Sequence, residues 1–316
     1  MKPRILLTGK TGQIGAELQR LLLHLGEVIA PDRQQLDLLK PSDIRRVIQE
    51  VRPYLIVNAA AYTAVDQAET DAARAHVINA EAPALMAEEA RSVGAALLHY
   101  STDYVFDGLK KSPYDESDAP NPMSVYGRTK LEGEEVIRES GVPHLIFRTA
   151  WVYSTRGRNF LLSILRLATQ RTELRVVSDQ VGTPTSSHAV ASATSTILAQ
   201  LYGRGNGLAS FVEASGTYHM TAAGETNWCE FAQAILEEAS GMSPNVPWFK
   251  AATNGRLLMA RRVIPISTSE YPASAVRPRY SVLSNARLAQ TFTCALPDWR
   301  TQLRLVFSES EHSSRS

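Results

Sequence analysis

The feature that most constrains the fold is a glycine-rich turn near the start of the chain, between an apolar run and an amphipathic stretch. Residues 4–8 are typical of a buried strand, and residues 16–25 are typical of a helix that ends at Gly26. Between them, Gly9, Gly12 and Gly15 form the pattern Gly-x-x-Gly-x-x-Gly. Glycines let the backbone approach a pyrophosphate, and a helix N-terminus offers unpaired N–H groups to an anion. This order of elements predicts the opening of a dinucleotide-binding fold.

Strand-like and helix-like segments continue to alternate along the first half of the chain. Apolar runs predict strands at residues 28–30, 55–58, 97–101 and 145–149, with helices at residues 42–51 and 126–140 between them. This alternation predicts an α/β fold with a doubly wound parallel sheet. We expect residues 1–151 to form the dinucleotide-binding domain, with some later helices returning to it. Residues 152–307 are expected to form mainly a smaller substrate-binding lobe, with an irregular segment at 203–216, and residues 308–316 a flexible tail.

Composition excludes several classes of protein. A net charge of +1 over 316 residues, without long basic runs, argues against a nucleic-acid partner. The two cysteines are far apart and outside any Cys-x-x-Cys, which predicts reduced thiols. The seven histidines show no metal-ligand spacing, and the first apolar run is too short for a signal peptide or a membrane span. These features predict a soluble cytoplasmic enzyme.

Tyr126 and Lys130 are a candidate chemical pair. They stand four residues apart in a predicted helix, which places them one turn apart on the same face. A fixed positive charge beside a phenol favours the phenolate, so Lys130 is expected to lower the pKa of Tyr126. The alternative is an ordinary exposed helix face, because this spacing is common.

Two further positions follow predicted strands, where ligands bind in open parallel sheets. Asp32 can accept hydrogen bonds from an adenosine ribose, whereas Arg33 next to it can meet a 2′-phosphate. Having both residues leaves NAD and NADP open. Thr102 follows the strand at 97–101 and can offer a hydroxyl to a substrate oxygen, although threonine often only caps a turn there.

Taken in order, these motifs make the chain resemble the extended short-chain dehydrogenases/reductases and, among them, the dTDP-4-dehydrorhamnose reductases. The resemblance covers nearly the whole chain. Its motifs lie at residues 9–15, 57–66, 100–106, 126–130, 147–153, 179–185 and 296–299.

The resemblance implies a role for each matching residue. Gly9, Gly12, Gln13, Ile14 and Gly15 would line the cofactor pyrophosphate, and Asp32, Arg33, Asp37 and Leu38 would lie near its adenosine half. Ala61, Tyr62 and Thr63 would line the cofactor further along, where Tyr126 and Lys130 would also meet it. Thr102, Tyr126 and Lys130 would form the catalytic triad, while Thr102, Asp103 and Trp151 would contact the sugar. The implied reaction is reduction of the C4 keto group of dTDP-4-dehydro-L-rhamnose by NADPH or NADH.

The alternatives are a reductase or epimerase of another nucleotide-linked 4-keto sugar, and a non-catalytic regulatory subunit on the same fold. No membrane or nucleic-acid partner is expected, and the protein would be a monomer or a homodimer. Some members of the resembling family hold Mg²⁺ between carboxylates. The matching positions here are Glu17, His188 and, near the C-terminus, Glu309. Because Mg²⁺ binds imidazole poorly, we expect no metal in this chain.

Overall fold

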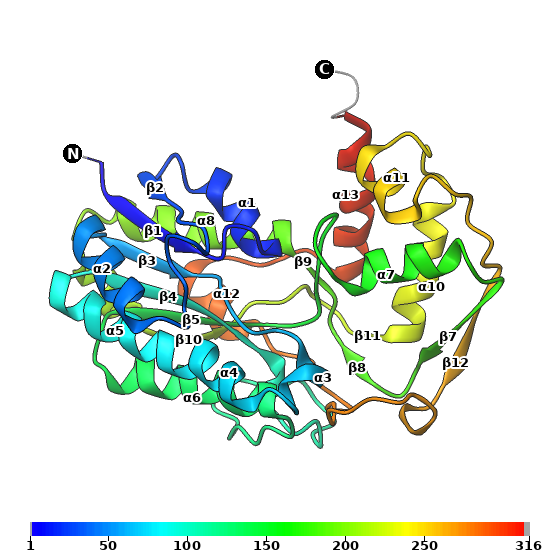
Figure 1. Ribbon diagram of the computed structural model, residues 1–316, viewed down its shortest axis with the longest axis horizontal. Coiled ribbons are helices and arrows are strands. Elements are labelled where there is room, and N and C mark those ends of the chain that lie inside the picture. Colours follow the sequence, from blue (N-terminus) through cyan, green and yellow to red (C-terminus); the bar gives the residue numbers. More distant parts are fainter. Residues whose placement is uncertain (1, 313–316) are drawn as a thin grey trace.

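A six-stranded parallel sheet forms the centre of the larger lobe (Figure 1). The computed structural model describes residues 2–312, and the side chains of residues 2–308. The strands are β1 (Arg4–Thr8), β2 (Glu27–Ile29), β3 (Leu55–Asn58), β4 (Ala96–Thr102), β5 (His144–Thr149) and β10 (Gly216–His219). They lie in the order β10-β5-β4-β3-β1-β2, and every neighbouring pair is parallel. The predicted doubly wound α/β fold is confirmed.

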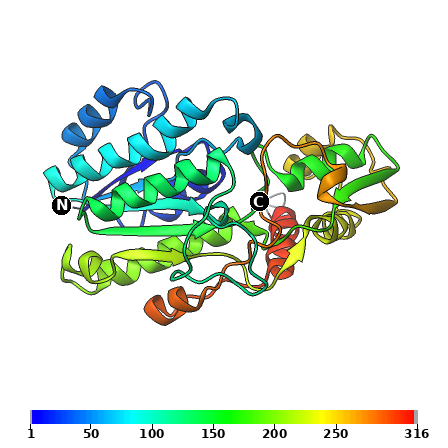
Figure 2. The ribbon, with the colours of Figure 1, turned by 90° about the horizontal axis from the view of Figure 1, so that it is seen from below.

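Helices cover both faces of this sheet (Figure 2). One face packs on α1 (Gln13–Leu21), α8 (Ser187–Gly203), α9 (Ala209–Glu213) and α12 (Ala286–Phe292). The other packs on α2 (Pro41–Val51), α5 (Ala82–Val93) and α6 (Val125–Glu139). In β1, Ile5 and Leu7 enter the first apolar cluster and Leu6 enters the second. Burial on both faces explains why the strands are continuous apolar runs rather than alternating ones.

Short helical segments lead from the sheet toward the longer helices. The turns α3 (Val65–Ala68) and α4 (Ala72–His76) and the π-helix η1 (Val77–Glu81) precede α5. A single 3₁₀ turn, η2 (Asp103–Val105), follows β4 directly.

The smaller lobe has its own apolar core. Its parallel strand pair is β7 (Glu173–Val177) with β12 (Arg262–Ile266), and the 3₁₀ turn η3 (Thr268–Glu270) follows β12. Its helices are α7 (Phe160–Ala168), α10 (Trp228–Ala239), α11 (Pro247–Thr253) and α13 (Trp299–His312). Two small strand pairs complete the fold, β6 (Val152–Tyr153) with β9 (Thr185–Ser186), and β8 (Val181–Gly182) with β11 (Thr226–Asn227).

The chain returns to the larger lobe after residue 151. Helix α8 lies on the sheet face beside α1, and α9 and α12 join the same apolar cluster. Strand β10 also returns, and it forms the edge of the sheet beside β5. The division at 151/152 therefore marks where the chain first leaves the sheet, while the assignment of functions to the lobes stays a prediction.

Most element ends differ from the expected ones by one or a few residues, and three differences matter here. Helix α1 begins at Gln13 instead of Ala16, because Gly12 already has the extended backbone of a helix N-cap. The segment expected to be irregular at 203–216 contains α9. The expected tail from residue 308 is helical as far as His312, and residues 313–316 lie outside the described residues.

The described residues contain no helix with both the length and the apolar character needed to cross a bilayer. Cys229 and Cys294 are both free thiols.

Candidate functional site

A cleft of about 1090 Å³ opens at the carboxyl ends of the parallel strands, with walls from both lobes. Thr8, Thr102 and Thr149, the last residues of β1, β4 and β5, lie on its floor. Fifteen of the predicted site residues line it: Gly9, Gly12, Gln13, Ile14, Asp32, Arg33, Asp37, Leu38, Ala61, Thr63, Thr102, Asp103, Tyr126, Lys130 and Trp151. Gly15 and Tyr62 do not line it.

The glycine turn brings the backbone against the neighbouring strand. Gly9 has φ +74°, and a Cβ there would lie 2.7 Å from the backbone of Ala59. Gly12 is the N-cap of α1 and makes no side-chain cap, so no cap side chain covers the first N–H groups of this nine-residue helix, whose first residues line the cleft. Gly15 has a packing function instead, because a Cβ at Gly15 would lie 2.1 Å from the carbonyl oxygen of Gly9.

The predicted adenosine end of the cleft carries mixed charge. One carboxylate oxygen of Asp32 accepts the backbone N–H groups of Gln34 and Gln35, at 2.9 and 3.1 Å, and so shapes the turn after β2. Arg33 is mostly exposed, and its Nε lies 3.7 Å from Oδ1 of Asp37. The Arg33 guanidinium is therefore available to a ligand, because only a weak contact with the Asp37 carboxylate holds it.

Tyr62 faces a second hollow rather than the main cleft. Its hydroxyl donates to Asp71 at 3.1 Å, and its backbone N–H donates to Asn79 at 2.9 Å. This hollow, about 330 Å³, also has Arg33 and Arg74 in its wall. Sequence position alone could not separate Tyr62 from its neighbours Ala61 and Thr63, which do line the cleft.

The start of α6 is held tightly where Tyr126 stands. Ser124 caps the helix by accepting the N–H of Gly127 at 3.1 Å, and the N–H of Val125 donates to Glu69 at 2.8 Å. Gly127 lies against η2, because a Cβ there would be 2.2 Å from the carbonyl oxygen of Tyr104. The lack of a side chain at Gly127 therefore lets α6 approach the end of β4.

This approach packs the Tyr126 ring edge-on against Tyr104, with centroids 5.8 Å apart, and brings the phenol near enough to Thr102 for that hydroxyl to affect its pKa. Burial raises the pKa of Tyr126 to about 12, and the hydrogen bond to Thr102 acts in the opposite direction. The expected lowering of this pKa by Lys130 is not found. The phenol of Tyr126 thus keeps its proton at neutral pH.

The Lys130 side chain lies on the expected face of α6, but its amine points elsewhere. Nζ donates to the carbonyl oxygen of Tyr100 at 2.6 Å and lies 2.9 Å from Nε2 of His99. Burial lowers the pKa of Lys130 to about 7, against an opposing effect of Glu134. Helical spacing predicts where Cβ points, but it does not fix the end of a four-carbon side chain.

Asp103 is a buried acid in the cleft wall. Burial raises its pKa to about 7, although hydrogen bonds to Ser281 and Thr102 oppose this. Oδ1 accepts the Thr102 hydroxyl at 3.1 Å, whereas Oδ2 is buried without a hydrogen-bond partner among the described residues. A buried polar atom without a partner, in a residue that lines a cleft, calls for an explanation, and a ligand contact is one.

Trp151 adopts a strained backbone conformation, with φ +47°. For a bulky residue this is an outlier that clusters at functional sites. Its indole stacks on Trp228 with centroids 3.5 Å apart, and Gly182 lies against the ring, where a Cβ would be 2.5 Å away. Trp228 also lines the cleft, so two stacked indoles form part of the wall.

Gln13 joins the glycine turn to the smaller lobe. Its Oε1 accepts from Ser154 and Asn159, both at 2.8 Å, and its Nε2 donates to the carbonyl of Val152 at 3.3 Å. The side chain therefore connects both walls of the cleft.

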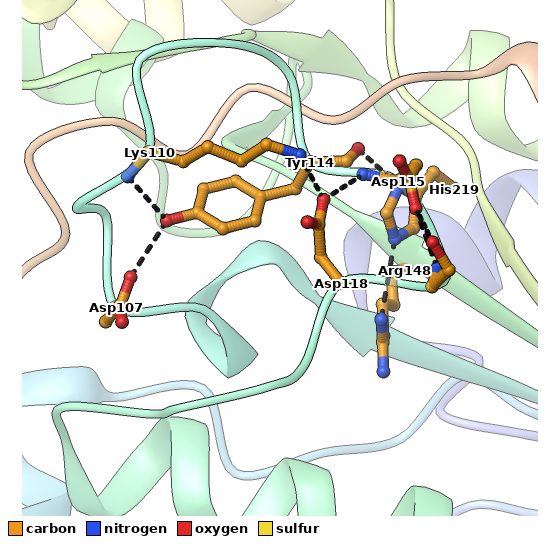
Figure 3. A network of polar contacts seen from close by, with 8 residues as sticks. Asp107, Lys110, Tyr114, Asp115, Asp118, Arg148 and His219 are labelled. Carbon is orange, nitrogen blue, oxygen red and sulfur yellow. Dashed lines mark hydrogen bonds and ion pairs between the residues drawn. The ribbon is translucent and has the colours of Figure 1, made fainter.

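A polar network orders the loop between η2 and α6 (Figure 3). The Tyr114 hydroxyl donates to Asp107 at 2.9 Å, and the Lys110 ammonium binds Asp118 at 2.5 Å. Nδ1 of His219, the last residue of β10, donates to the Tyr114 carbonyl at 3.1 Å. The loop is thus tied to the sheet edge.

The residues considered for Mg²⁺ form a pair. Nδ1 of His188 lies 3.4 Å from Glu17, and this hydrogen bond, with further help from nearby arginines, lowers the pKa of Glu17. The side chain of Glu309 lies outside the described residues. Across the described part of the chain, no three His, Cys, Asp or Glu side chains converge as metal ligands do. The expected absence of a metal stays a prediction.

Comparison with known proteins places this geometry in a family. The family described as "RmlD substrate binding domain" matches residues 1–312. The dTDP-4-dehydrorhamnose reductase of Burkholderia thailandensis is 45% identical over 297 residues, covering 94% of this chain and 95% of that protein. The chain belongs to the dTDP-4-dehydrorhamnose reductase family. The Escherichia coli K12 member of that name is 40% identical over 309 residues, covering 96% of this chain and 97% of its own length.

Solved structures of dTDP-4-dehydrorhamnose reductases agree with this placement. The Bacillus anthracis enzyme, crystallised in complex with NADP, superposes with a TM-score of 0.84 at 34% identity, covering 98% of this chain and all of that chain. The Thermus thermophilus UDP-glucose 4-epimerase, at 19% identity and a TM-score of 0.74, shares the fold alone.

The sequence analysis missed two notable site features. Trp228 is the first residue of α10, and no local signal places its ring on Trp151, 77 positions away. His99 lies inside a predicted strand, where it looked like any strand residue. A histidine within an otherwise apolar strand, four residues before the acid of the cleft, was the available signal.

Proposed function

We propose that this chain is an NADPH-dependent oxidoreductase that reduces the C4 keto group of dTDP-4-dehydro-L-rhamnose to give dTDP-L-rhamnose. One observation carries the proposal beyond family membership. Thr102 and Tyr126 line the same cleft as the bare glycine turn at Gly9 and Gly12. An acid and an anion-binding turn in one cleft suit reduction of a carbonyl by a dinucleotide.

The residues present fit a nicotinamide dinucleotide. At Gly9 the backbone leaves no room for a Cβ, and the helix that follows begins without a side-chain cap. This arrangement suits a pyrophosphate. Gly12, Gln13 and Ile14 would hold it, with Asp32, Arg33, Asp37 and Leu38 near the adenosine and Ala61 and Thr63 further along. Arg33 supports use of NADPH and Asp32 supports use of NADH, so we expect both to bind. When bound, the cofactor supplies the hydride.

Tyr126 is the proton donor in this proposal. A developing C4 alkoxide is a strong base, about as basic as hydroxide. The phenol, with its pKa near 12, is protonated at rest and still acidic enough to give its proton to that oxygen. Thr102 would hydrogen-bond the same oxygen, so charge develops against donors already in place.

Lys130 would hold the nicotinamide ribose, and Asp103 and Trp151 would meet the sugar. The partnerless Oδ2 of Asp103 supports a hydrogen bond with a sugar hydroxyl. The indole of Trp151 supports contact with the apolar C–H groups of a deoxysugar. The reaction would be a step of nucleotide-sugar and surface polysaccharide biosynthesis in the cytoplasm. The enzyme would act as a monomer or a homodimer.

The test is NADPH oxidation with dTDP-4-dehydro-L-rhamnose, followed by identification of the product. We expect one NADPH consumed per dTDP-L-rhamnose formed. Tyr126→Phe should lower turnover about 10²–10⁴-fold while leaving NADPH affinity nearly intact, since only the proton is lost. An epimerase would convert substrate without consuming NADPH in proportion, and a regulatory subunit would show no turnover. Either result would refute the proposal.

A further inference from the structure

A chain of buried polar groups runs beneath the cleft and ends at Lys130. Thr8, Asn58, His99 and Lys130 come from β1, β3, β4 and α6, and each is at most 3% exposed. The Thr8 hydroxyl donates to Asn58 Oδ1 at 2.7 Å, Asn58 Nδ2 lies 3.0 Å from His99 Nδ1, and His99 Nε2 lies 2.9 Å from Lys130 Nζ. The proposed reaction assigns no part to His99.

The backbone fixes the orientation of the Asn58 amide. The N–H of Ala60 can only donate, and it points to Asn58 Oδ1 at 3.3 Å. With Oδ1 accepting from Ala60 and Thr8, the NH₂ group of Asn58 faces His99 Nδ1. Rotating the amide would set that NH₂ group against the N–H of Ala60 and leave buried donors unpaired, which is costly.

This orientation decides the tautomer of His99. Since Nδ1 accepts from Asn58, a neutral imidazole carries its proton on Nε2, the atom beside Lys130. A doubly protonated ring is disfavoured, because burial holds the pKa of His99 well below its usual value. His99 Nε2–H therefore donates to Lys130.

A lysine nitrogen can accept a hydrogen bond only when it is uncharged, because an ammonium has no lone pair. Lys130 satisfies this if its amine accepts from His99 and donates to the carbonyl oxygen of Tyr100 at 2.6 Å. Glu134, one turn along α6, favours the charged form, but it is paired with Arg148 at 2.6 Å. Tyr126, protonated at neutral pH, and the buried Asp103 are ionisable groups that line the same cleft as Lys130.

We propose that His99 is a positioning residue for Lys130. In the free protein, His99 holds Lys130 as an uncharged amine. Cofactor binding therefore includes the uptake of a proton by that amine. The proposal rests on the proposed function in one respect, the contact between Lys130 and the nicotinamide ribose. A ribose offers hydroxyl oxygens to an ammonium, so the bound state favours the charged form.

The first test reads the tautomer directly. In ¹⁵N-histidine-labelled protein, the resonances that disappear in His99→Asn belong to His99. We expect the neutral Nε2–H tautomer in the free protein at pH 7 to 8. A neutral Nδ1–H tautomer or an imidazolium at His99 would overturn the proposal.

The second test measures proton uptake, from the calorimetric enthalpy of NADPH binding in buffers of different ionisation enthalpy at pH 8. With a pKa of about 7 in the free protein and an ordinary one in the complex, Lys130 should take up about 0.9 proton. The share due to Lys130 is the difference between wild type and Lys130→Met, which leaves any contribution of Asp103 in both. A difference near zero would overturn the proposal.

His99→Asn separates positioning from general disruption. Its Oδ1 can still accept from Asn58, but nothing remains at the place of Nε2 to donate to Lys130. Lys130 should then lose the hydrogen bond that favours its uncharged form, so its pKa in the free protein should rise and proton uptake on NADPH binding should fall; unchanged uptake would refute the role of His99. If this variant fails to fold, His99→Gln is used instead to assign the ¹⁵N resonances of His99. Loss of the reductase activity would leave the tautomer result intact, so the two proposals can fail separately.

Discussion

The buried ion pair beneath the proposed active site makes a sharp stability prediction. Arg148 on β5 binds Glu134 on α6 through two hydrogen bonds, Nε to Oε1 at 2.9 Å and Nη2 to Oε2 at 2.6 Å. The two side chains are 3% and 0% exposed. Glu134 lies one turn after Lys130, so this pair fixes the helix that carries the proposed proton donor. Arg148 also lies over the ring of Phe106, 5.1 Å from its centroid.

Arg148→Met should leave the Glu134 carboxylate buried and without its main partner. Breaking a buried pair in this way costs about 3–5 kcal/mol of unfolding free energy. At about 2–4 °C per kcal/mol, the melting temperature should fall by roughly 6–20 °C. Arg138→Met is the matched control, since Arg138 contacts the same carboxylate at 3.0 Å from a side chain that is 37% exposed. That surface contact is worth about 0–1 kcal/mol.

The assay is thermal melting followed by far-ultraviolet circular dichroism, which reports the sheet. Tryptophan fluorescence would report mainly the smaller lobe, because Trp228, Trp248 and Trp299 pack on its core. The double variant Glu134→Leu/Arg148→Met removes both charges and should recover part of the loss. An Arg148→Met protein no less stable than Arg138→Met, or a double variant no better than Arg148→Met, would refute the reasoning.

The same pair predicts the effect of pH. Burial alone would raise the pKa of Glu134, but the hydrogen bonds and charge of Arg148 outweigh it and hold that pKa below its usual value. The stabilisation is thus complete above the unfolded-state pKa of about 4.3 and is lost as pH falls through the lower folded value. The gap in melting temperature between wild type and Arg148→Met should therefore narrow below about pH 4. A gap that widens on acidification would contradict this sign.

Three further outcomes are expected. Arg33→Ala should weaken NADPH binding about tenfold and NADH binding little, because a partly exposed charged hydrogen bond is lost; equal losses in a fluorescence titration would show that Arg33 does not meet the 2′-phosphate. Exhaustive EDTA treatment should leave turnover and size-exclusion mass unchanged, and a loss restored by Mg²⁺ would show that a site survives at Glu17 and His188. Gly127→Ala should lower kcat about 100-fold, because its Cβ would force α6 away from Tyr104. Gly203→Ala, which meets nothing within 4 Å, is the control, and equal kcat values for the two variants would contradict the close-approach argument.

The sequence predicted the central strands well because burial on both faces leaves a strong signal. Strands β3 and β4 are buried along their entire length, and both were located from apolar runs. Strand β10 was missed since its four residues, Gly-Thr-Tyr-His, form no apolar run. It becomes a strand by pairing with the exposed edge of β5, which is a tertiary contact.

In the site, sequence reasoning identified which residues gather but not how they are oriented. The carboxyl ends of parallel strands meet at one edge, so Thr102 and the glycine turn had to be neighbours. The destination of the Lys130 amine depends on His99 and the Tyr100 carbonyl, which lie about 30 positions away. Trp151, with its positive φ, packs on Gly182 and Trp228, and no local pattern encodes these contacts.

The repeated passage of the chain between the lobes has a consequence for dissecting the protein. A fragment ending at residue 151 would lack β10 and α8, which supply a sheet edge and a helical cover for Ile5 and Leu7. A fragment starting at residue 152 would carry those elements with no sheet to receive them. No single cut in the coding sequence therefore yields either lobe intact. Neither fragment should fold alone, whereas the two fragments mixed together should be able to assemble. Neither lobe should fold when it is moved alone into another protein.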